Sequence, residues 1–318
     1  MKRIVLLLAV LSVIASARAA HDFIMPDSLR PGDKVAVCSP SYSIGAADVD
    51  MACRRMEAEG WVPVVMPHTL DAHGHYAGTD ANRLADLRSA LLDPEIKAIV
   101  CARGGYGAIH LLQALDSLYF RIEPKWLVGF SDVTALHALM HRFGYMSIHG
   151  PMPVTFDADE ESTQLLFDML KGQPRSLTAS PHRFNRCGVA EGTLVGGNFA
   201  VMAHLLGTPY DVIQPGSILF IEDVGEPVYK IERLFYQLRF SGVLEELGGL
   251  IVGEFSDYKH DPAYASMESM IRSMVEPYGY PVAFGVPIGH GKINHPVIES
   301  APVRLTVAAD TTRVDYLF

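Results

Sequence analysis

Between residues 34 and 143, the chain alternates short apolar runs with longer stretches of helical periodicity. The runs are too short for helices and have no polar face, which is typical of strands covered on both sides. Strands are expected at Lys34–Val37, Val62–Met66, Ala98–Cys101 and Trp126–Phe130, and helices at Ala47–Glu59, Asn82–Leu92, Gly107–Leu115 and Val133–Phe143. This alternation predicts an α/β fold: an N-terminal three-layer domain with a parallel sheet between helices.

Small and polar residues follow three of these strands. They are Ser39-Pro-Ser41 after the first strand, Arg103-Gly-Gly-Tyr-Gly107 after the third and Ser131-Asp132 after the fourth. Ligands of open parallel sheets bind just beyond the carboxyl ends of the strands. We therefore expect a cleft with hydroxyls and free backbone N–H groups at this edge.

The pattern changes after Phe156. Residues 157–187 are polar and contain prolines, with one short helix expected around Gln164–Leu170, and they are interpreted as a linker between domains 20–156 and 188–318. The C-terminal domain is predicted to be mixed α+β, with the active site at the interface between the domains. Its expected elements are a glycine-rich turn at Gly192–Asn198, helices at Phe199–Leu206, Ile231–Ser241 and Met267–Val275, and strands at Ser217–Ile221, Gly249–Gly253, Pro281–Phe284 and Val303–Val307.

Residues 1–19 have the pattern of a secretory signal peptide. Lys2-Arg3 precede the apolar run Ile4–Ile14, and small residues lie at Ala17 and Ala19. The run is shorter than the roughly 20 residues that span a bilayer, although an uncleaved anchor is the alternative. Cleavage removes three cations, so the 299-residue product carries a net charge of −13. We expect an exported, soluble, periplasmic or extracellular protein without a stable membrane anchor, and such acidity disfavours nucleic acid as a partner.

The cysteines and histidines do not form a recognisable metal pattern. Cys38, Cys53, Cys101 and Cys187 fit neither a CxxC redox pair nor a zinc knuckle. Buried free thiols are the favoured interpretation, although export would permit disulfides. His137 and His141 are four residues apart on an expected helix, but no acidic or thiol ligand completes a set, and no metal or cofactor is predicted.

Ser131 lies where a strand turns directly into a helix. Such a turn exposes the hydroxyl beside the unpaired N–H groups at the helix start, which favours oxyanion stabilisation. A helix N-cap is the simpler alternative. The Gly-x-Ser-x-Gly elbow of α/β-hydrolases is excluded because Val133 replaces its second glycine. The turn Arg103–Gly107 lacks the Lys-Ser/Thr pair of a P-loop. Either it supplies a second donor to the oxyanion, or its role is purely structural.

Several glycine-rich and polar motifs occur in a characteristic order along the chain. They are Ala102–Ala108, Gly129-Phe-Ser-Asp132, His149-Gly-Pro-Met152, Gly192–Asn198, Gly207-Thr-Pro209, Leu219-Phe-Ile-Glu-Asp223 with Tyr229 and Glu232-Arg233, and Ile288-Gly-His-Gly291. From about Pro31 to its end, the chain resembles the L,D-carboxypeptidases, a serine peptidase family that includes microcin-immunity peptidases.

The resemblance implies a triad divided between the two domains. Ser131 would be the nucleophile, His290 the general base and Glu222 the acid that orients it. Asp223 and Glu226 are the alternatives for the acid, and His149 and His295 for the base.

Further roles involve the loops beside Ser131. The backbone N–H of Asp132, with that of Gly104 or Gly105, would hold the oxyanion. Arg103 or the amides of Gly104 and Gly105 would bind the substrate's terminal carboxylate, although Arg103 could instead hold its loop.

The implied reaction is removal of the terminal D-alanine from murein tetrapeptides. An immunity-type peptidase acting on peptidyl-nucleotide conjugates and a secreted cleft-binding protein without catalysis are the alternatives. The resemblance also implies a homodimer, and Leu234, Leu238 and Val243 form an apolar helix face that belongs either to an interface or to the core.

Overall fold

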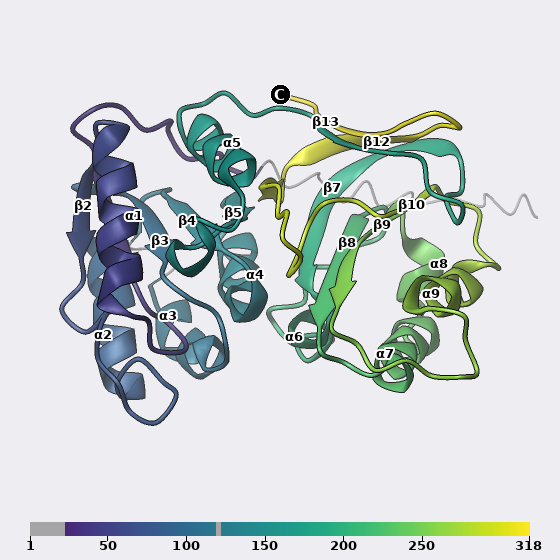
Figure 1. Ribbon diagram of the computed structural model, residues 1–318, viewed down its shortest axis with the longest axis horizontal. Helices are drawn as coiled ribbons and strands as arrows, with labels where there is room; N and C mark the ends of the chain where they lie inside the picture. Colours follow the sequence, from purple (N-terminus) through teal and green to yellow (C-terminus); the bar gives the residue numbers. More distant parts are fainter. Residues whose placement is uncertain (1–22, 119–121) are drawn as a thin grey trace, which may run out of the picture.

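The structure, a computed structural model, describes residues 23–118 and 122–318. The expected leader, residues 1–19, lies outside the described residues. Two sheets lie side by side, each with its own helices (Figure 1). The predicted α/β fold, with a mostly parallel first sheet and a mixed second sheet, is confirmed.

The first sheet has strand order β11-β5-β4-β3-β1-β2. Five of its strands are parallel: β1 (Lys34–Cys38), β2 (Val62–Val65), β3 (Ile96–Cys101), β4 (Trp126–Gly129) and β5 (Ser147–His149). Its helices are α1 (Ala46–Ala58), α2 (Asp80–Leu92), α3 (Leu112–Asp116), α4 (Thr134–Arg142) and α5 (Glu160–Leu170).

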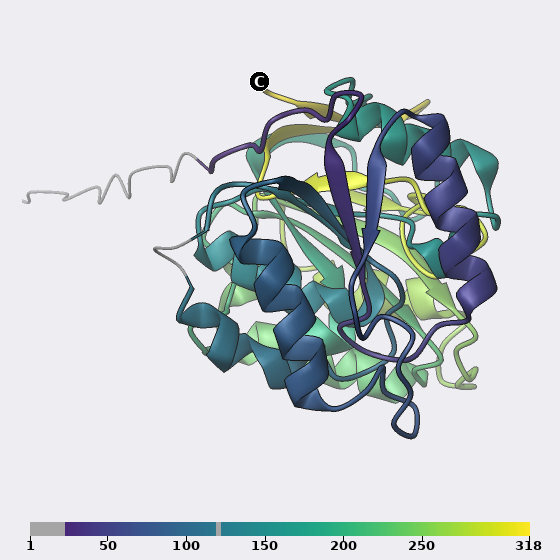
Figure 2. The same ribbon diagram turned by 90° about the vertical axis from the view of Figure 1, so that its left-hand side faces the viewer.

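Both faces of this sheet are buried at β1, β3 and β4, which explains their continuous apolar runs, whereas the edge strand β2 is partly exposed. In β1, Val35 and Val37 pack with α1 and α5, whereas Ala36 and Cys38 face α2 and α4. Successive strand residues point to opposite faces, so every position must be apolar. Figure 2 shows α1 and α2 on opposite sides of the strands.

The structure differs from the prediction in short elements. The helix expected at Gly107–Leu115 is a 3-10 turn (Ala108–Leu111) followed by α3. The strands β5 and β11 (Val297–Glu299) were not expected, since three residues are too few to display a period. β11 comes from the C-terminal part of the chain and pairs antiparallel with β5, which makes it an edge strand of the N-terminal sheet.

The second sheet has strand order β10-β9-β8-β7-β12-β13-β6. Its first four strands are parallel and the others antiparallel. The strands are β6 (Leu177–Ala179), β7 (Gly188–Asn198), β8 (Ile218–Val224), β9 (Gly249–Ser256), β10 (Val282–Phe284), β12 (Pro302–Val307) and β13 (Thr312–Tyr316). The helices α6 (Phe199–Ala203), α7 (Val228–Phe240), α8 (Val243–Glu246) and α9 (Met267–Val275) cover one face.

The glycine-rich turn expected at Gly192–Asn198 is instead the second half of β7. Its glycines permit close backbone contact: a Cβ at Gly192 would overlap the carbonyl oxygen of Gly216, and one at Gly196 that of Phe220. Close packing against the neighbouring strand, rather than a turn, explains this cluster of glycines.

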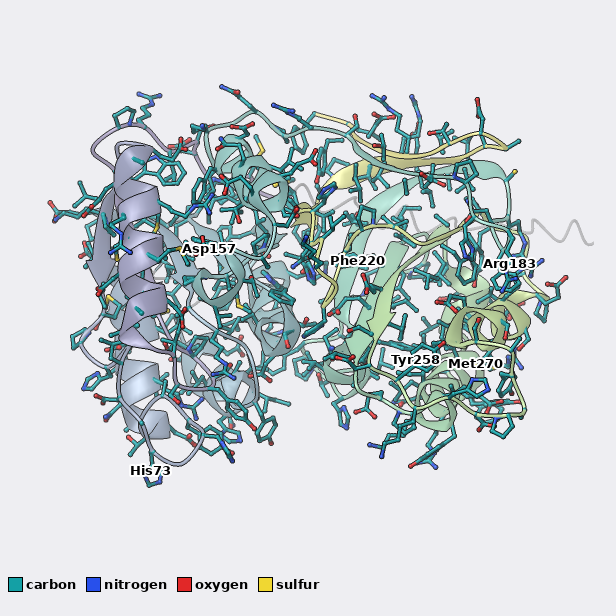
Figure 3. The ribbon with its side chains drawn as sticks, viewed as in Figure 1. His73, Asp157, Arg183, Phe220, Tyr258 and Met270 are labelled. Atoms are coloured by element: carbon teal, nitrogen blue, oxygen red, sulfur yellow. The ribbon has the colours of Figure 1, made fainter. Side chains whose placement is uncertain are left out.

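The stretch 157–187 contains two regular elements, α5 and β6. Phe167 of α5 packs against Trp61, with ring centroids 5.4 Å apart, and Arg55 of α1 forms an ion pair with Asp157. Figure 3 places Asp157 in the N-terminal half and Phe220 of β8 near the boundary between the halves. The Phe220 ring lies 5.1 Å from that of His149 in β5, so the two halves are in direct contact.

Cys38 and Cys101 are buried free thiols, as expected. Cys187 is exposed, contrary to the expectation, because it precedes β7 and lies outside the sheet; Cys53 is half-buried. Leu238 on α7 is buried in the core, whereas Leu234 and Val243 are partly buried against it. Among residues 23–118 and 122–318, no helix is long and apolar enough to cross a membrane.

Candidate active site

Ser131, His290 and Glu222 form one hydrogen-bonded chain across the two halves. The hydroxyl of Ser131 lies 2.9 Å from Nε2 of His290, and Nδ1 of His290 lies 2.5 Å from Oε2 of Glu222. The carboxylate accepts a hydrogen bond from the Nδ1–H group, which leaves the Nε2 lone pair facing the serine hydroxyl. This is the arrangement by which an imidazole removes a proton from serine.

The backbone at Ser131 has an unusual conformation. β4 ends at Gly129, Phe130 is extended, and Ser131 begins a 3-10 turn with φ +65° before α4 starts. A Cβ at Gly129 would lie 2.8 Å from a methyl group of Val133, so glycine lets this turn close. The Ser131 hydroxyl bonds to His290 and does not cap the helix, which contradicts the N-cap alternative.

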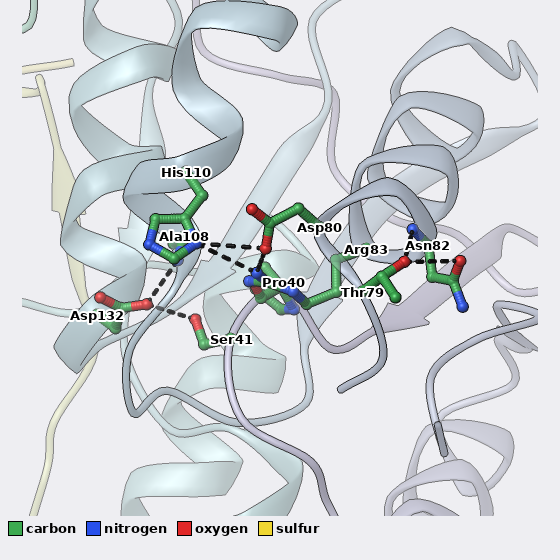
Figure 4. Close-up of polar contacts among 9 residues, drawn as sticks. All are labelled: Pro40, Ser41, Thr79, Asp80, Asn82, Arg83, Ala108, His110 and Asp132. Carbon is green, nitrogen blue, oxygen red and sulfur yellow. Dashed lines mark hydrogen bonds and ion pairs between the residues drawn. The ribbon is translucent and has the colours of Figure 1, made fainter. Parts of the chain in front are cut away.

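Asp132 ties together the loops that follow three strands (Figure 4). Its Oδ2 accepts hydrogen bonds from Ser41 Oγ at 2.6 Å and from the backbone N–H of Ala108 at 2.8 Å. Arg83 holds the same serine loop by donating to the carbonyl oxygen of Pro40. The expected convergence of the segments after β1, β3 and β4 is therefore present, with the Asp132 carboxylate at its centre.

Gly104 is packed against the serine. A Cβ at this position would lie 2.9 Å from the Ser131 Cβ and 3.1 Å from Oγ. Gly105 has φ +114° and packs against the Tyr42 ring. Arg103 donates to the carbonyl oxygen of Ser43 at 3.0 Å, so it holds a neighbouring loop, one of the two roles open from the sequence.

Strand alternation separates the two adjacent acids of β8. Glu222 is fully buried and faces His290, whereas Asp223 accepts hydrogen bonds from Asn198 Nδ2 and from the backbone N–H of Ala200. Burial and, second, the charge of Glu222 raise the pKa of Asp223 to about 6. The remaining alternative, Glu226, pairs with Lys230. Of these acids, Glu222 is the one that contacts the imidazole.

His290 has a raised pKa. Burial alone would lower it, but the charge of Glu222, the hydrogen bond to Glu222 and the charge of Asp223 outweigh that effect. The Phe130 ring lies 4.9 Å from the imidazole and covers one side of it. The alternatives are placed elsewhere: His149 is fully buried and burial lowers its pKa, while the backbone of His295 bonds to Pro287.

The two histidines of α4 have partners of their own. His137 Nε2 donates to the Gly129 carbonyl oxygen at 2.8 Å, and its Nδ1 lies 2.8 Å from Ser147 Oγ. Burial lowers the pKa of His137 to about 4. His141 Nδ1 lies 2.9 Å from Ser300 Oγ. In the part of the chain that the structure describes, no group of three or more acidic, histidine or cysteine side chains could hold a metal ion.

Several site residues were not predicted from the sequence. Ser41 belongs to a strand-end motif, but its bond to Asp132 follows only from the fold. A pocket of about 120 Å³ beside His290 includes Phe130, Lys292 and Asn294, none of which was a site candidate. The closeness of Lys292 and Asn294 to His290 in sequence was the available signal.

Comparisons with known proteins match both halves of the chain to one family. Residues 35–150 match the LD-carboxypeptidase N-terminal domain, and residues 191–305 match the C-terminal domain. The murein tetrapeptide carboxypeptidase of Pseudomonas aeruginosa is 32% identical over 276 residues, covering 82% of this chain and 89% of that protein.

Solved structures have the same fold. The muramoyltetrapeptide carboxypeptidase from Oxalobacter formigenes aligns with a TM-score of 0.81 and 26% identity, covering 89% of this chain and 98% of the other. The microcin C7 self-immunity protein MccF, in complex with aspartyl sulfamoyl adenosine, aligns with a TM-score of 0.80 over 92% of this chain and 98% of its own. At 18% identity, the MccF likeness concerns the fold alone.

Proposed function

Because the chain belongs to the LD-carboxypeptidase family and is a serine-type carboxypeptidase, we propose that it releases the terminal D-alanine of murein tetrapeptides through Ser131, His290 and Glu222. The observation that carries this proposal is the hydrogen-bonded chain, with 2.5 Å between acid and base and 2.9 Å between base and nucleophile. A cleft that only binds peptides needs no such chain.

The reaction proceeds through an acyl-enzyme. His290 takes the hydroxyl proton as Ser131 Oγ attacks the carbonyl carbon of the diamino acid's L-centre. The imidazolium returns that proton to the amine of D-alanine, the C–N bond breaks, and the tripeptide remains as an ester on Ser131. Water, deprotonated by His290, then hydrolyses the ester and restores the hydroxyl. Glu222 holds the Nδ1 proton and stabilises the imidazolium throughout.

The oxyanion is held by backbone N–H groups at the turn. We assign one to Asp132 and the second to Gly104, whose backbone packs against the Ser131 side chain; Gly105 instead lies against Tyr42. The positive φ of Ser131 supports this assignment because it turns the chain sharply before the helix starts. Fixed donors of this kind stabilise negative charge that develops in the transition state.

The immunity-type activity remains the second candidate because MccF has the same fold. A nucleotide conjugate needs an exposed aromatic ring on which its base can stack. Trp61 and Trp126 are 3% and 2% exposed, so neither offers such a face. Tyr106 and Tyr229 are 48% and 50% exposed, so stacking on a tyrosine stays open. The murein peptide is the better supported substrate because the chain is 32% identical to a murein tetrapeptide carboxypeptidase and only 18% identical to MccF.

The proposal is tested by incubating the mature protein with murein tetrapeptide and measuring D-alanine and tripeptide. We expect the wild type to release both and Ser131→Ala to lose at least about a thousandfold in rate with an unchanged melting temperature. Ser43→Ala is the matched control because the Ser43 hydroxyl lies outside the triad. Undiminished release by Ser131→Ala would contradict the assignment. Cleavage of an aminoacyl sulfamoyl adenosine but not the tetrapeptide would favour the second candidate.

Export and assembly are further proposals. Murein lies outside the cytoplasmic membrane, so the leader pattern of residues 1–19 fits the proposed substrate. N-terminal sequencing of protein from the periplasm or medium is expected to begin at Ala20. Full-length protein confined to the cytosol would contradict export. The implied homodimer predicts about twice the chain mass in light scattering.

A further inference from the structure

The pocket of about 120 Å³ beside His290 has a buried hydrogen-bond donor in its wall. Asn294 is 6% exposed, and its Oδ1 accepts the backbone N–H of Gly289 at 3.0 Å. An N–H group cannot donate to the amide nitrogen, so this bond fixes the orientation of the side chain. Nδ2 is then a buried donor without a partner among the described residues, which is rare unless a ligand supplies the acceptor.

The backbone around Asn294 is held rigidly. Its N–H donates to Ser162 Oγ at 3.1 Å, and that hydroxyl donates to Asp159 Oδ2 at 2.6 Å. Asp159 is the N-cap of α5, and its Oδ2 also accepts the N–H of Ser162 at 2.9 Å. This chain of bonds joins the His290 loop to α5, so the amide donor occupies a defined position.

The pocket wall also carries a cation. Lys292 is exposed and lines the pocket together with Asn294 and His290. Within residues 23–118 and 122–318, no carboxylate oxygen is recorded within 4.0 Å of the Lys292 ammonium group. An exposed ammonium and a fixed amide donor that line the same pocket together form a site for a carboxylate.

The mechanism determines which carboxylate enters this pocket. His290 Nε2 faces Ser131 and must deliver its proton to the leaving amine, so the departing D-amino acid lies beside His290. Its carboxylate is bonded to the same Cα as that amine and must therefore lie close to the imidazole. The pocket next to His290 is where that group arrives, and Phe130 and Pro151 supply an apolar wall for the methyl group.

One negative group also lines the pocket, Asp159. The hydrogen bond from Ser162 lowers the pKa of Asp159 against the effect of burial, and the nearby charges of His295 and Lys292 lower it further. Its Oδ2 is already occupied by two hydrogen bonds from Ser162. Its charge is therefore partly compensated, and it acts as the anchor of Ser162 and Asn294.

We propose that this pocket is the leaving-group subsite, in which the Lys292 ammonium and the Asn294 amide bind the terminal carboxylate of the substrate. The proposal rests on the proposed function and adds the origin of its carboxypeptidase specificity. It replaces Arg103, a candidate from the sequence, because the Arg103 guanidinium donates to the Ser43 carbonyl oxygen.

The experiment compares a tetrapeptide ending in free D-alanine with the same peptide ending in D-alanine amide. We expect the wild type to prefer the acid by about tenfold or more in kcat/KM. Lys292→Met should reduce this ratio several-fold through a raised KM for the acid alone, while Lys292→Arg retains it. Asn294→Asp keeps the acceptor for Gly289 but replaces the donor with a negative oxygen, so it should abolish the preference. A substitution that only disturbs His290 lowers kcat/KM equally for both substrates and leaves the acid-to-amide ratio unaltered.

Three outcomes overturn the assignment. An acid-to-amide ratio near one in the wild type excludes carboxylate recognition. A ratio unchanged by Lys292→Met and Asn294→Asp places that recognition elsewhere. A preference of the wild type for the amide over the acid indicates that the pocket takes an uncharged or cationic group. Failure to release anything from either peptide overturns the proposed function as well, whereas release with an unaltered ratio overturns this assignment alone.

Discussion

At the scale of single residues, the site depends on a strained backbone. Ser131 is one of three non-glycine residues with positive φ among the described residues, at a cost of about 1 kcal/mol. The surroundings compensate for it: His290 bonds the hydroxyl, and the Asp132 carboxylate joins the adjacent loops. These contacts hold the strained backbone conformation, which fixes the direction of the serine side chain before substrate binds.

The contact between Gly104 and Ser131 gives the first prediction. In Gly104→Ala, the new methyl group would lie 2.9 Å from the Ser131 Cβ and would displace the nucleophile. We expect kcat/KM for D-alanine release to fall about a hundredfold, since a shift of about 1 Å costs that much. Gly279→Ala is the matched control because no atom lies within 4 Å of its Cβ and its φ is ordinary. Equal activity of the two variants would show that Gly104 has no positioning role.

The raised pKa of His290 gives the second prediction. In the proposed mechanism the neutral imidazole is the base, so activity should be lost as pH falls through this raised pKa. Glu222→Gln removes the largest effect that raises it, so the acidic limb of the pH–rate profile should move to lower pH. The rate itself should fall about a thousandfold or more, because the imidazole loses its charged partner.

Glu226→Gln is the control for that profile, since Glu226 pairs with Lys230 rather than with the imidazole. Its acidic limb should coincide with that of the wild type. An acidic limb that stays in place in Glu222→Gln would mean that another group controls this part of the profile.

At the scale of elements, whether a strand could be predicted from the sequence depended on its length and on how far away its partner strand lies in the chain. In the first sheet, β1, β3 and β4 have enough buried positions to be recognised, whereas the edge strand β2 has none and is recognised by its valines alone. The turn after β4 identified Ser131. β11 has only three residues, and its antiparallel partner is far away in the sequence: Val297 pairs with His149, 148 positions earlier. No local sequence pattern encodes such a pairing. The glycines of β7 were misinterpreted because a turn and a close strand contact both require glycine.

The same limit applies to the candidate site. Alternation in β8 separates Glu222 from Asp223, but the sequence does not say which face meets His290. The ordered motifs supplied that choice. Asn294 is close to His290 in sequence, but only the three-dimensional contacts reveal its unpaired amide nitrogen.

The pairing of β11 with β5 buries an acid and gives the third prediction. Glu299 lies opposite Ser147. Burial raises the pKa of Glu299 well above its usual value, although a hydrogen bond from the backbone of Gly196 partly lowers it. The folded state therefore holds a proton that the unfolded state releases near pH 4.5, and this group destabilises the fold increasingly as pH rises. Glu299→Gln cannot ionise, so its melting temperature relative to the wild type should increase from pH 4.5 to pH 8. A difference that is constant over this range would contradict a protonated Glu299.

At the scale of the whole molecule, the two halves share one interior. One apolar cluster includes Leu136 of α4 together with Phe199 of α6, and Thr134 Oγ1 accepts the backbone N–H of Asn198. The proposed nucleophile belongs to one half, and the proposed base and acid to the other. A movement of about 1 Å between the halves would break the catalytic chain, so their rigid association is a functional requirement.

This shared interior predicts that the described part of the protein unfolds in a single cooperative transition. Phe220 of β8 is fully buried against His149 of the other half, and Phe220→Ala should lower the free energy of unfolding by about 3–5 kcal/mol. Phe240→Ala is the matched control, because that ring is 82% exposed and its loss should cost less than about 0.5 kcal/mol.

Urea titrations followed by circular dichroism, by tryptophan fluorescence and by residual D-alanine release test the prediction. Both tryptophans lie in the N-terminal half, whereas Phe220 lies in the C-terminal half. If the halves unfold together, Phe220→Ala shifts the fluorescence midpoint as far as the midpoints of the other two signals. If they unfold separately, activity is lost early while the fluorescence transition stays in place. Only the first result is compatible with an active site that is held together by one core.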